Sequence, residues 1–252
     1  MKTNIKNGNW MKSAVQAICC LALVLVLALG LLPGMTPTAE AADSDILYVG
    51  DKSIDLSLVS SGSGDGWSYA NNTLTNCALV HEASGTRAAI SYEGTQALTI
   101  KLVGTNAVTR ITSGSLNISR SCAMYFPNAD ITITGDGELT CIGGESKTYS
   151  YGIYANNLTM NGGKVTASGG EAWDADNGES YGLYVRGSLT LQGDKTKVTV
   201  TGGKAGSISA GVGSTWGVSG SVRISGGTLT ATGGESYDSY GINTDRKSTR
   251  LN

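Results

Sequence analysis

The sequence predicts an all-β protein, a right-handed parallel β-helix with three short strands in each coil. Three observations predict this fold. Glycine supplies 36 of the 252 residues, a unit of roughly 30 residues recurs along the chain, and apolar and polar residues alternate within each unit at the period of a strand. The glycines follow no three-residue period, which excludes collagen, and 40% apolar residues is too high a fraction for a disordered chain.

The repeat is clearest between residues 150 and 171. There the chain reads Ser-Tyr-Gly-Ile-Tyr (150–154), Leu-Thr-Met-Asn-Gly-Gly (158–163) and Val-Thr-Ala-Ser-Gly-Gly-Glu (165–171). Further copies are expected at 89–102, at 122–145, at 180–203, at 216–235, where the copy opens with Trp-Gly-Val, and from 239 onward. The spacing varies between each Gly-Gly pair and the next Tyr-Gly, which predicts an insertion-tolerant junction loop at that place.

Alternation along each strand assigns a side to every side chain. Five apolar residues of the clearest unit are expected to point into the coil: Ile153, Leu158, Met160, Val165 and Ala167. One coil buries too few side chains to offset the conformational entropy lost when it becomes ordered. Stability is therefore expected to come from the stacking of coils and from hydrogen bonds between them.

Four segments follow from these patterns. Residues 1–41 place lysines before a long apolar run and Ala-Glu-Ala before residue 42, which predicts a cleaved signal peptide and a secreted protein; an uncleaved membrane anchor is the alternative. Residues 42–86 are a looser N-terminal cap or first coil, and residues 87–244 carry the β-helix repeats. Residues 245–252 resemble a translated sequencing adaptor, so we expect a non-native tail on a β-helix truncated at its C-terminus.

The balance of charge limits the partners. Residues 42–244 contain 12 Lys and Arg residues and 18 Asp and Glu residues, a net charge of about −6. Nucleic acid requires a basic surface, so nucleic-acid binding is not expected. Direct binding to an anionic membrane is not expected either. An anionic polysaccharide would need a bridging cation.

Aromatic residues are the first candidate binding groups. If Ile153 points inward, alternation places Tyr125, Tyr154 and Tyr184 on one outer face in successive coils, about 5 Å apart. Stacked outward tyrosines form a flat platform for sugar rings; a self-stacking ladder that only stiffens the solenoid is the alternative. Trp173, in a junction loop, is a further candidate sugar contact, as is Tyr237. The aromatic residue just before the repeated glycine has the same alternation as Ile153 and is expected in the core or at a coil corner. These residues are Tyr151, Tyr181, Trp216 and Tyr240.

Carboxylates gather in the junction loops. Four of them lie between residues 171 and 179 and are the candidate calcium ligands: Glu171, Asp174, Asp176 and Glu179. Their oxygens suit a hard cation, although the spacing does not fit an EF-hand. A solvated acidic loop is the alternative. In stacked coils Glu171 also comes close to the glutamates of neighbouring junctions, and Lys204 occupies the equivalent place as a counter-charge.

The remaining chemistry-bearing residues give no catalytic motif. After cleavage three cysteines remain, Cys77, Cys122 and Cys141, and their odd number favours buried free thiols over a disulfide. The single histidine, His81, has no nucleophile signature near it and is expected to be structural. The sequence contains no G-x-S-x-G, H-E-x-x-H or P-loop motif.

Behind a signal peptide, the Tyr-Gly-Ile, Leu-Thr-x-x-Gly-Gly and Val-Thr-Ala-x-Gly-Gly elements resemble a family of bacterial secreted carbohydrate-binding β-helix proteins over roughly residues 45–244. The resemblance implies a fold similar to that of pectate lyases, bound calcium, and attachment to cellulose or polygalacturonate without cleavage. It transfers no ligand residue. Lyase activity would require an arginine beside an acidic calcium cluster, and outward-facing Arg186 and Arg223 have no acidic partner on their own or matching strands.

The sequence thus predicts a secreted or cell-surface, non-catalytic protein that binds a polysaccharide, such as cellulose, a pectin-like polymer or a cell-wall glycan, with calcium as a possible bridge. Two alternatives stay open. One is a pectate-lyase-like polysaccharide lyase or hydrolase, and the other is a rigid stalk of a surface adhesin.

Overall fold

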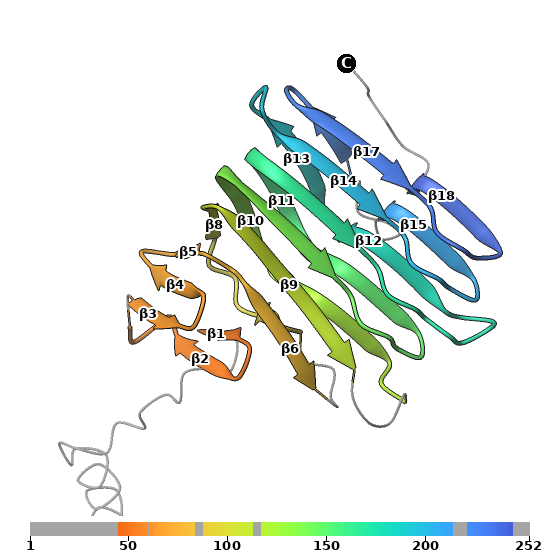
Figure 1. The fold of residues 1–252 in the computed structure, drawn as a ribbon, viewed down its shortest axis with the longest axis horizontal. Coiled ribbons are helices and arrows are strands. Elements are labelled where there is room, and N and C mark those ends of the chain that lie inside the picture. The colour runs from red at the N-terminus through yellow and green to blue at the C-terminus, as the bar shows by residue number, and fades with distance from the viewer. Residues whose placement is uncertain (1–44, 60, 84–87, 113–116, 214–220, 244–252) are drawn as a thin grey trace, which may run out of the picture. The chain divides into compact units, whose positions relative to one another are not determined.

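The computed structural model describes residues 45–59, 61–83, 88–112, 117–213 and 221–243. It is 67% strand, and its parallel coils stack into a β-solenoid of about five turns (Figure 1). This confirms the predicted fold class. Within the described ranges no helix has the length and hydropathy needed to cross a membrane. The predicted signal peptide, Trp216 and the C-terminal tail lie outside the described residues.

The described part of the chain begins with two small antiparallel units that form the cap. The first pairs β1 (Ile46–Val49) with β2 (Lys52–Asp55), and the second contains β3 (Ser61–Gly64), β4 (Trp67–Ala70) and β5 (Thr73–Thr75). Strand β5 and the next strand, β6 (Leu79–Ala83), pair in parallel with the following coil. The cap therefore passes directly into the first coil.

Each of the coils that follow has three sides. In the second coil the sides are separate strands, β7 (Ile90–Tyr92), β8 (Leu98–Leu102) and β9 (Thr105–Thr112). In each of the next two coils one continuous strand runs along all three sides: β10 (Arg120–Ile142) in the third coil and β11 (Tyr149–Ser168) in the fourth. The later coils contain β12 (Glu179–Val185), β13 (Ser188–Gln192) and β14 (Lys197–Thr201), then β15 (Ile208–Gly213), β16 (Ser221–Ile224) and β17 (Thr228–Thr232), and finally β18 (Asp238–Asn243).

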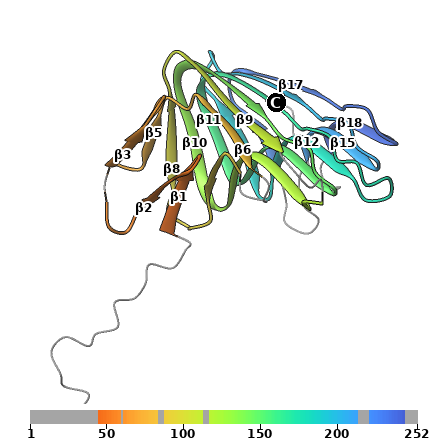
Figure 2. The same ribbon diagram turned by 60° about the horizontal axis from the view of Figure 1, so that its bottom comes forward.

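Parallel pairing between coils produces three faces (Figure 2). The first face joins β7, the start of β10, the start of β11, β12, β15 and β18. The second face runs from β5 and β8 to β13 and β16, and the third from β6 and β9 to β14 and β17. Equivalent residues of successive coils are therefore neighbours in space.

The register corrects one part of the predicted repeat. Ser180 pairs with Ser209 and Tyr181 with Ala210, so the copy that follows Tyr181 begins at Ser209 and not at Trp216. Paired serines are then separated by 29, 30, 29 and 30 residues, and the additional residues lie between β15 and β16 rather than in the junction loop. Trp-Gly-Val resembles Tyr-Gly-Ile in sequence, but the residue that pairs with Tyr181 in the next coil is Ala210. Ala210 is apolar and fully buried there.

The core lies where the alternation predicted it. Each of the five predicted inward residues of β11 is at most 1% exposed, and the same positions of the neighbouring coils are apolar; for example, Leu158 lies between Ile131 and Leu189. Burial of a leucine-sized side chain contributes about 1.5–3 kcal/mol. The core is thus one continuous column of stacked apolar residues.

A ladder of buried serines joins the coils beside this column. Ser180 Oγ donates to the carbonyl oxygen of Gly170 at 2.7 Å and accepts from the N–H of Gly203 at 2.9 Å. Ser150 and Ser209 repeat the arrangement one coil before and one coil after. A Cβ atom on Gly203 would lie against the carbonyl oxygen of Gly170. The Ser-Tyr-Gly and Gly-Gly elements of the repeat are therefore two halves of one contact.

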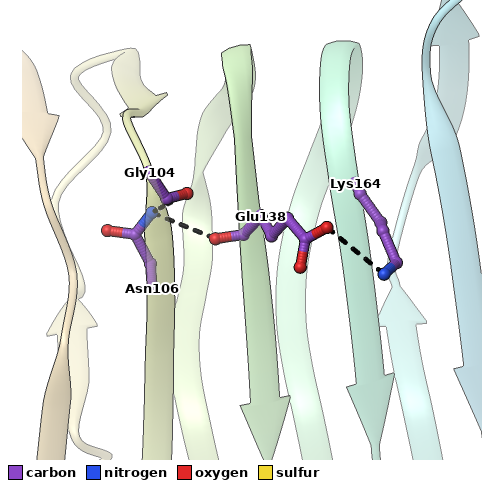
Figure 3. Close-up of polar contacts among 4 residues, drawn as sticks. All are labelled: Gly104, Asn106, Glu138 and Lys164. Carbon is purple, nitrogen blue, oxygen red and sulfur yellow. Dashed lines mark hydrogen bonds and ion pairs between the residues drawn. The ribbon is translucent and has the colours of Figure 1, made fainter.

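Asn106 joins the first coils in a similar way (Figure 3). Its side chain is buried, and its Nδ2 donates to the carbonyl oxygen of Glu138 at 3.0 Å and to that of Gly104 at 3.4 Å. Its Oδ1 accepts from the N–H of Cys77 at 2.7 Å. The Glu138 side chain points the other way and pairs with Lys164 at 3.3 Å. One buried amide thus connects three successive coils.

Candidate functional site

Three tyrosines form a row across the first face of the solenoid. Tyr125 pairs with Tyr154 in the strand register, and Tyr154 pairs with Tyr184. Their ring centroids are 4.9 Å and 5.1 Å apart, with interplanar angles of 46° and 19°. All three side chains are half-buried. We call these residues the tyrosine row, and its predicted register is confirmed.

Two more tyrosines support the row from beneath. Tyr151 and Tyr181 are buried and stack on each other at 5.7 Å. Each also contacts the row: the Tyr151 ring lies 5.1 Å from that of Tyr154, and the Tyr181 ring lies 5.0 Å from that of Tyr184. The rings therefore form a block at the coil corner, in a cluster separate from the main core.

The position of Tyr151 corrects the expectation that Tyr151 and Ile153 point to the same side of the strand. Ile153 belongs to the main core, whereas Tyr151 packs with the outer tyrosine Tyr154, so Tyr151 and Ile153 do not share a face. The residue between them, Gly152, approaches the backbone of Ser168 and Gly182 so closely that a Cβ atom would collide with carbonyl oxygens. The strict alternation of sides therefore ends at this glycine.

The ends of the row carry small residues. Tyr125 pairs with Ser91 in the preceding coil, and Tyr184 pairs with Gly213 in the following one. At the inner position, Tyr181 is followed by Ala210. The block of rings is therefore three coils long among the described residues.

Two arginines lie against the row. The guanidinium carbon of Arg120 lies 4.0 Å from the centroid of the Tyr125 ring, and its Nη1 donates to the Tyr125 hydroxyl at 2.8 Å. Burial raises the pKa of Tyr125 and Tyr154 above the usual value for tyrosine. The positive charge of Arg120 opposes this rise at both tyrosines, and that of Arg186 opposes it at Tyr154.

Arg120 was not singled out from the sequence. It pairs in register with Tyr149, and Tyr149 pairs with Glu179, so these three residues occupy one position at the edge of the tyrosine block. Glu179 Oε2 accepts a hydrogen bond from the Tyr181 hydroxyl at 2.8 Å. The sequence does contain a pattern that could have identified this position. A charged or aromatic residue stands two positions before each Cys-Ala or Tyr-Gly pair.

The other predicted aromatic contacts lie elsewhere. Trp173 is 41% exposed on the junction loop after β11, and its backbone N–H bonds to the carbonyl oxygen of Ser146 at 3.1 Å. Among the described residues it forms no ring pair with the tyrosine row. Tyr237 is 91% exposed and Tyr240 is 41% exposed, both in the last described coil. Tyr240 was expected in the core or at a coil corner, so its exposure differs from that prediction.

The acidic loop holds its carboxylates apart. Glu171 Oε1 pairs with Lys204 Nζ at 2.9 Å, which confirms Lys204 as its counter-charge. Asp174 Oδ1 accepts the backbone N–H groups of Asp176 and Asn177, both at 3.1 Å. Within the described ranges no three carboxylate, histidine or cysteine side chains converge where they could hold a metal ion. Calcium binding stays a prediction, which removal of the ion with a chelator would test.

The cysteines and the histidine are buried, as expected. Cys77, Cys122 and Cys141 are free thiols, and burial raises the pKa of Cys77 and of Cys122 to about 12. His81 is 6% exposed and lies 3.9 Å from the Asp51 carboxylate. Cys122 packs in the same cluster as Tyr151 and Tyr181, but its thiol is fully buried and its raised pKa keeps it protonated, so it is a poor nucleophile there.

No protein-family model, curated protein or solved structure matches this chain. The chemistry of the candidate site must therefore be judged from the residues themselves. Tyrosine rings provide flat apolar faces with a polar hydroxyl edge, which suits contact with ligands that have apolar faces and many hydroxyls.

Proposed function

We propose that the protein is a secreted, non-catalytic polysaccharide-binding solenoid, and that sugar rings lie along the exposed edges of the tyrosine row. The observation that supports the proposal is the register of Tyr125, Tyr154 and Tyr184, whose half-buried rings repeat at 4.9 Å and 5.1 Å on one face. Repeated rings offer repeated contacts to a polymer, and several weak contacts on one chain combine into useful affinity.

The packing beneath the row supports the same function. Because Tyr151 and Tyr181 hold the outer rings in place, a ligand would not have to immobilise them. Ordering a free side chain costs about 0.5–1.5 kcal/mol on binding, and a preorganised surface avoids that cost.

The test is retention of the purified protein on insoluble cellulose and on pectate gel, each with and without a chelator. We expect retention on at least one polysaccharide, and a substitution of Tyr154 and Tyr184 by leucine to abolish it. Leucine keeps an apolar side chain against the inner tyrosines but removes the ring and its hydroxyl. The comparison variant is Tyr237→Leu, which removes an exposed tyrosine that is also a candidate sugar contact but lies outside the row. Loss of retention in Tyr237→Leu alone would place the sugar contact outside the row.

The outcomes separate the alternatives. Loss of retention in the chelator would support the predicted calcium bridge. If the wild-type protein is retained on no polysaccharide, the binding function is refuted and a rigid stalk becomes the better interpretation, because rings that pack on one another also stiffen the solenoid. Release of unsaturated or reducing ends from pectin would instead establish an enzyme.

A further inference from the structure

We propose that Arg120 and Arg186 make the tyrosine row selective for sugars that carry a negative charge, either a carboxylate or a sulfate ester. This inference rests on the proposed function, since it assigns the substrate class of the same row. The acidic balance of residues 42–244 suggested that an anionic glycan would need a bridging cation. In this proposal the two guanidinium groups supply the positive charge that a bridging cation would otherwise supply.

Arg120 fixes a positive charge at one end of the row. Its guanidinium lies over the Tyr125 ring at 4.0 Å and donates to the hydroxyl of the same residue at 2.8 Å. An arginine stacked on an aromatic ring is held by both the charge and the flat contact. The group therefore covers one face of the Tyr125 ring and fixes a positive charge at this end of the row.

Arg186 brings a second positive charge from the other side. Its backbone N–H donates to the carbonyl oxygen of Ala155, the neighbour of Tyr154, at 3.0 Å. Its Nη1 donates to the carbonyl oxygen of Pro127 at 3.0 Å. Pro127 belongs to the coil of Tyr125, two coils before Arg186. The side chain thus reaches back beside the row, and it is exposed to an incoming ligand.

Tyr154 lies between these two charges. Both guanidinium groups act electrostatically on its hydroxyl. Among the described residues, two carboxylates also lie near the block: Glu93, which acts on Tyr125, and Glu179, which is bonded to the Tyr181 hydroxyl. Arg120 contacts the ring of Tyr125, the register partner of Tyr154, and Arg186 bonds to the residue after Tyr154. Two guanidinium groups therefore lie near the middle ring of the row.

A guanidinium group matches the geometry of a carboxylate or a sulfate because its N–H donors point in parallel pairs. The Tyr154 ring lies between the rings of Tyr125 and Tyr184, so a sugar would lie along the exposed edges of the row. There its charged substituent would be within reach of one or both arginines. A neutral sugar would gain only the contacts with the ring edges and hydroxyls. The geometry accordingly favours a charged glycan over a neutral one of the same backbone.

The test compares polygalacturonate with its fully methyl-esterified form, which has the same backbone without the charge. Binding is measured by titration calorimetry in a chelator, so that calcium cannot bridge. We expect the wild-type protein to bind the charged form at least about ten-fold more tightly, since hydrogen bonds between charged groups contribute roughly this much. Arg186→Gln should remove most of the preference, and Arg186→Lys should keep part of it.

Arg223→Gln is the matched control, because it removes an exposed arginine from the second face and should leave the preference unchanged. Dextran sulfate against dextran repeats the comparison for a sulfate ester and identifies which anion is preferred. Equal affinity for charged and neutral forms of both polymers would overturn the inference while leaving the proposed function intact. The inference would also be overturned if the Arg120→Gln/Arg186→Gln double variant folded and still preferred the charged polymer. Binding to none of the four polymers would overturn the proposed function, and this inference with it.

Discussion

Substitution of Ser180 by alanine removes one rung of the serine ladder. The hydroxyl donates to the carbonyl oxygen of Gly170 at 2.7 Å and accepts from the N–H of Gly203 at 2.9 Å, and the serine is fully buried. The variant leaves a backbone acceptor and a backbone donor without their partner, and each such group costs about 1–3 kcal/mol. We therefore expect the free energy of unfolding to fall by about 2–5 kcal/mol.

The structure offers a matched control in the same ladder. Ser121 is equally buried and pairs in register with Ser150, but among the described residues its Oγ has no hydrogen-bond partner. Because a buried hydroxyl without a partner is itself destabilising, Ser121→Ala should leave the free energy of unfolding unchanged or raise it. Urea unfolding followed by circular dichroism measures both variants. Equal shifts of the two midpoints would refute the conclusion that the ladder hydrogen bonds, rather than serine burial, join the coils.

Three more predictions concern the core and the tyrosine block. Gly203→Ala should lower the urea midpoint at least as much as loss of the serine, because its Cβ would collide with the Gly170 carbonyl oxygen; an unchanged midpoint would contradict this. Burial raises the pKa of Tyr181 above its ordinary value of 10.0, so the stability it contributes is complete below about pH 10 and lost as the pH rises above it. Tyr181→Phe should therefore make the urea midpoint fall less steeply between about pH 9 and 11. Burial raises the pKa of Cys77 and of Cys122 to about 12, so at about pH 8 a disulfide reagent should modify these thiols only after unfolding, and rapid native reaction would contradict their burial.

The sequence predicted the solenoid because its evidence is local and repeated. Alternating apolar residues such as Leu158 and Met160 identify the inner side of a strand, and a repeat of nearly constant length requires equivalent residues to stack. The error at Trp216 arose from the same method. Its Trp-Gly-Val matched the repeat better by residue type than Ala210 did, and only strand pairing shows which of the two continues the column.

The candidate site was predicted only in part. The tyrosine row follows directly from the register, but alternation does not predict the inner position of Tyr151 and its contact with Tyr154, nor the close approach of neighbouring backbone to Gly152 between them. Arg120 and Arg186 reach the row through long side chains, and the direction of a long side chain is set by its contacts rather than by its place in the repeat. The sequence shows which residues stack, whereas the contacts between corners require the structure.

The stiffness of the row and its suitability for ligands have the same cause. Ring distances near 5 Å follow from the spacing of hydrogen-bonded strands, which is about 4.8 Å. A solenoid therefore presents aromatic rings at a repeat that its backbone fixes, and the inner tyrosines hold them at that repeat without a ligand. The cation–π contact of Arg120 would also stabilise a purely structural row, whereas an exposed guanidinium such as that of Arg186 is open to a ligand. The guanidinium of Arg120 lies on the Tyr125 ring, and the exposed Arg186 reaches back along the row. That combination of fixed rings and positive charge is the feature that favours a binding surface over a passive spacer.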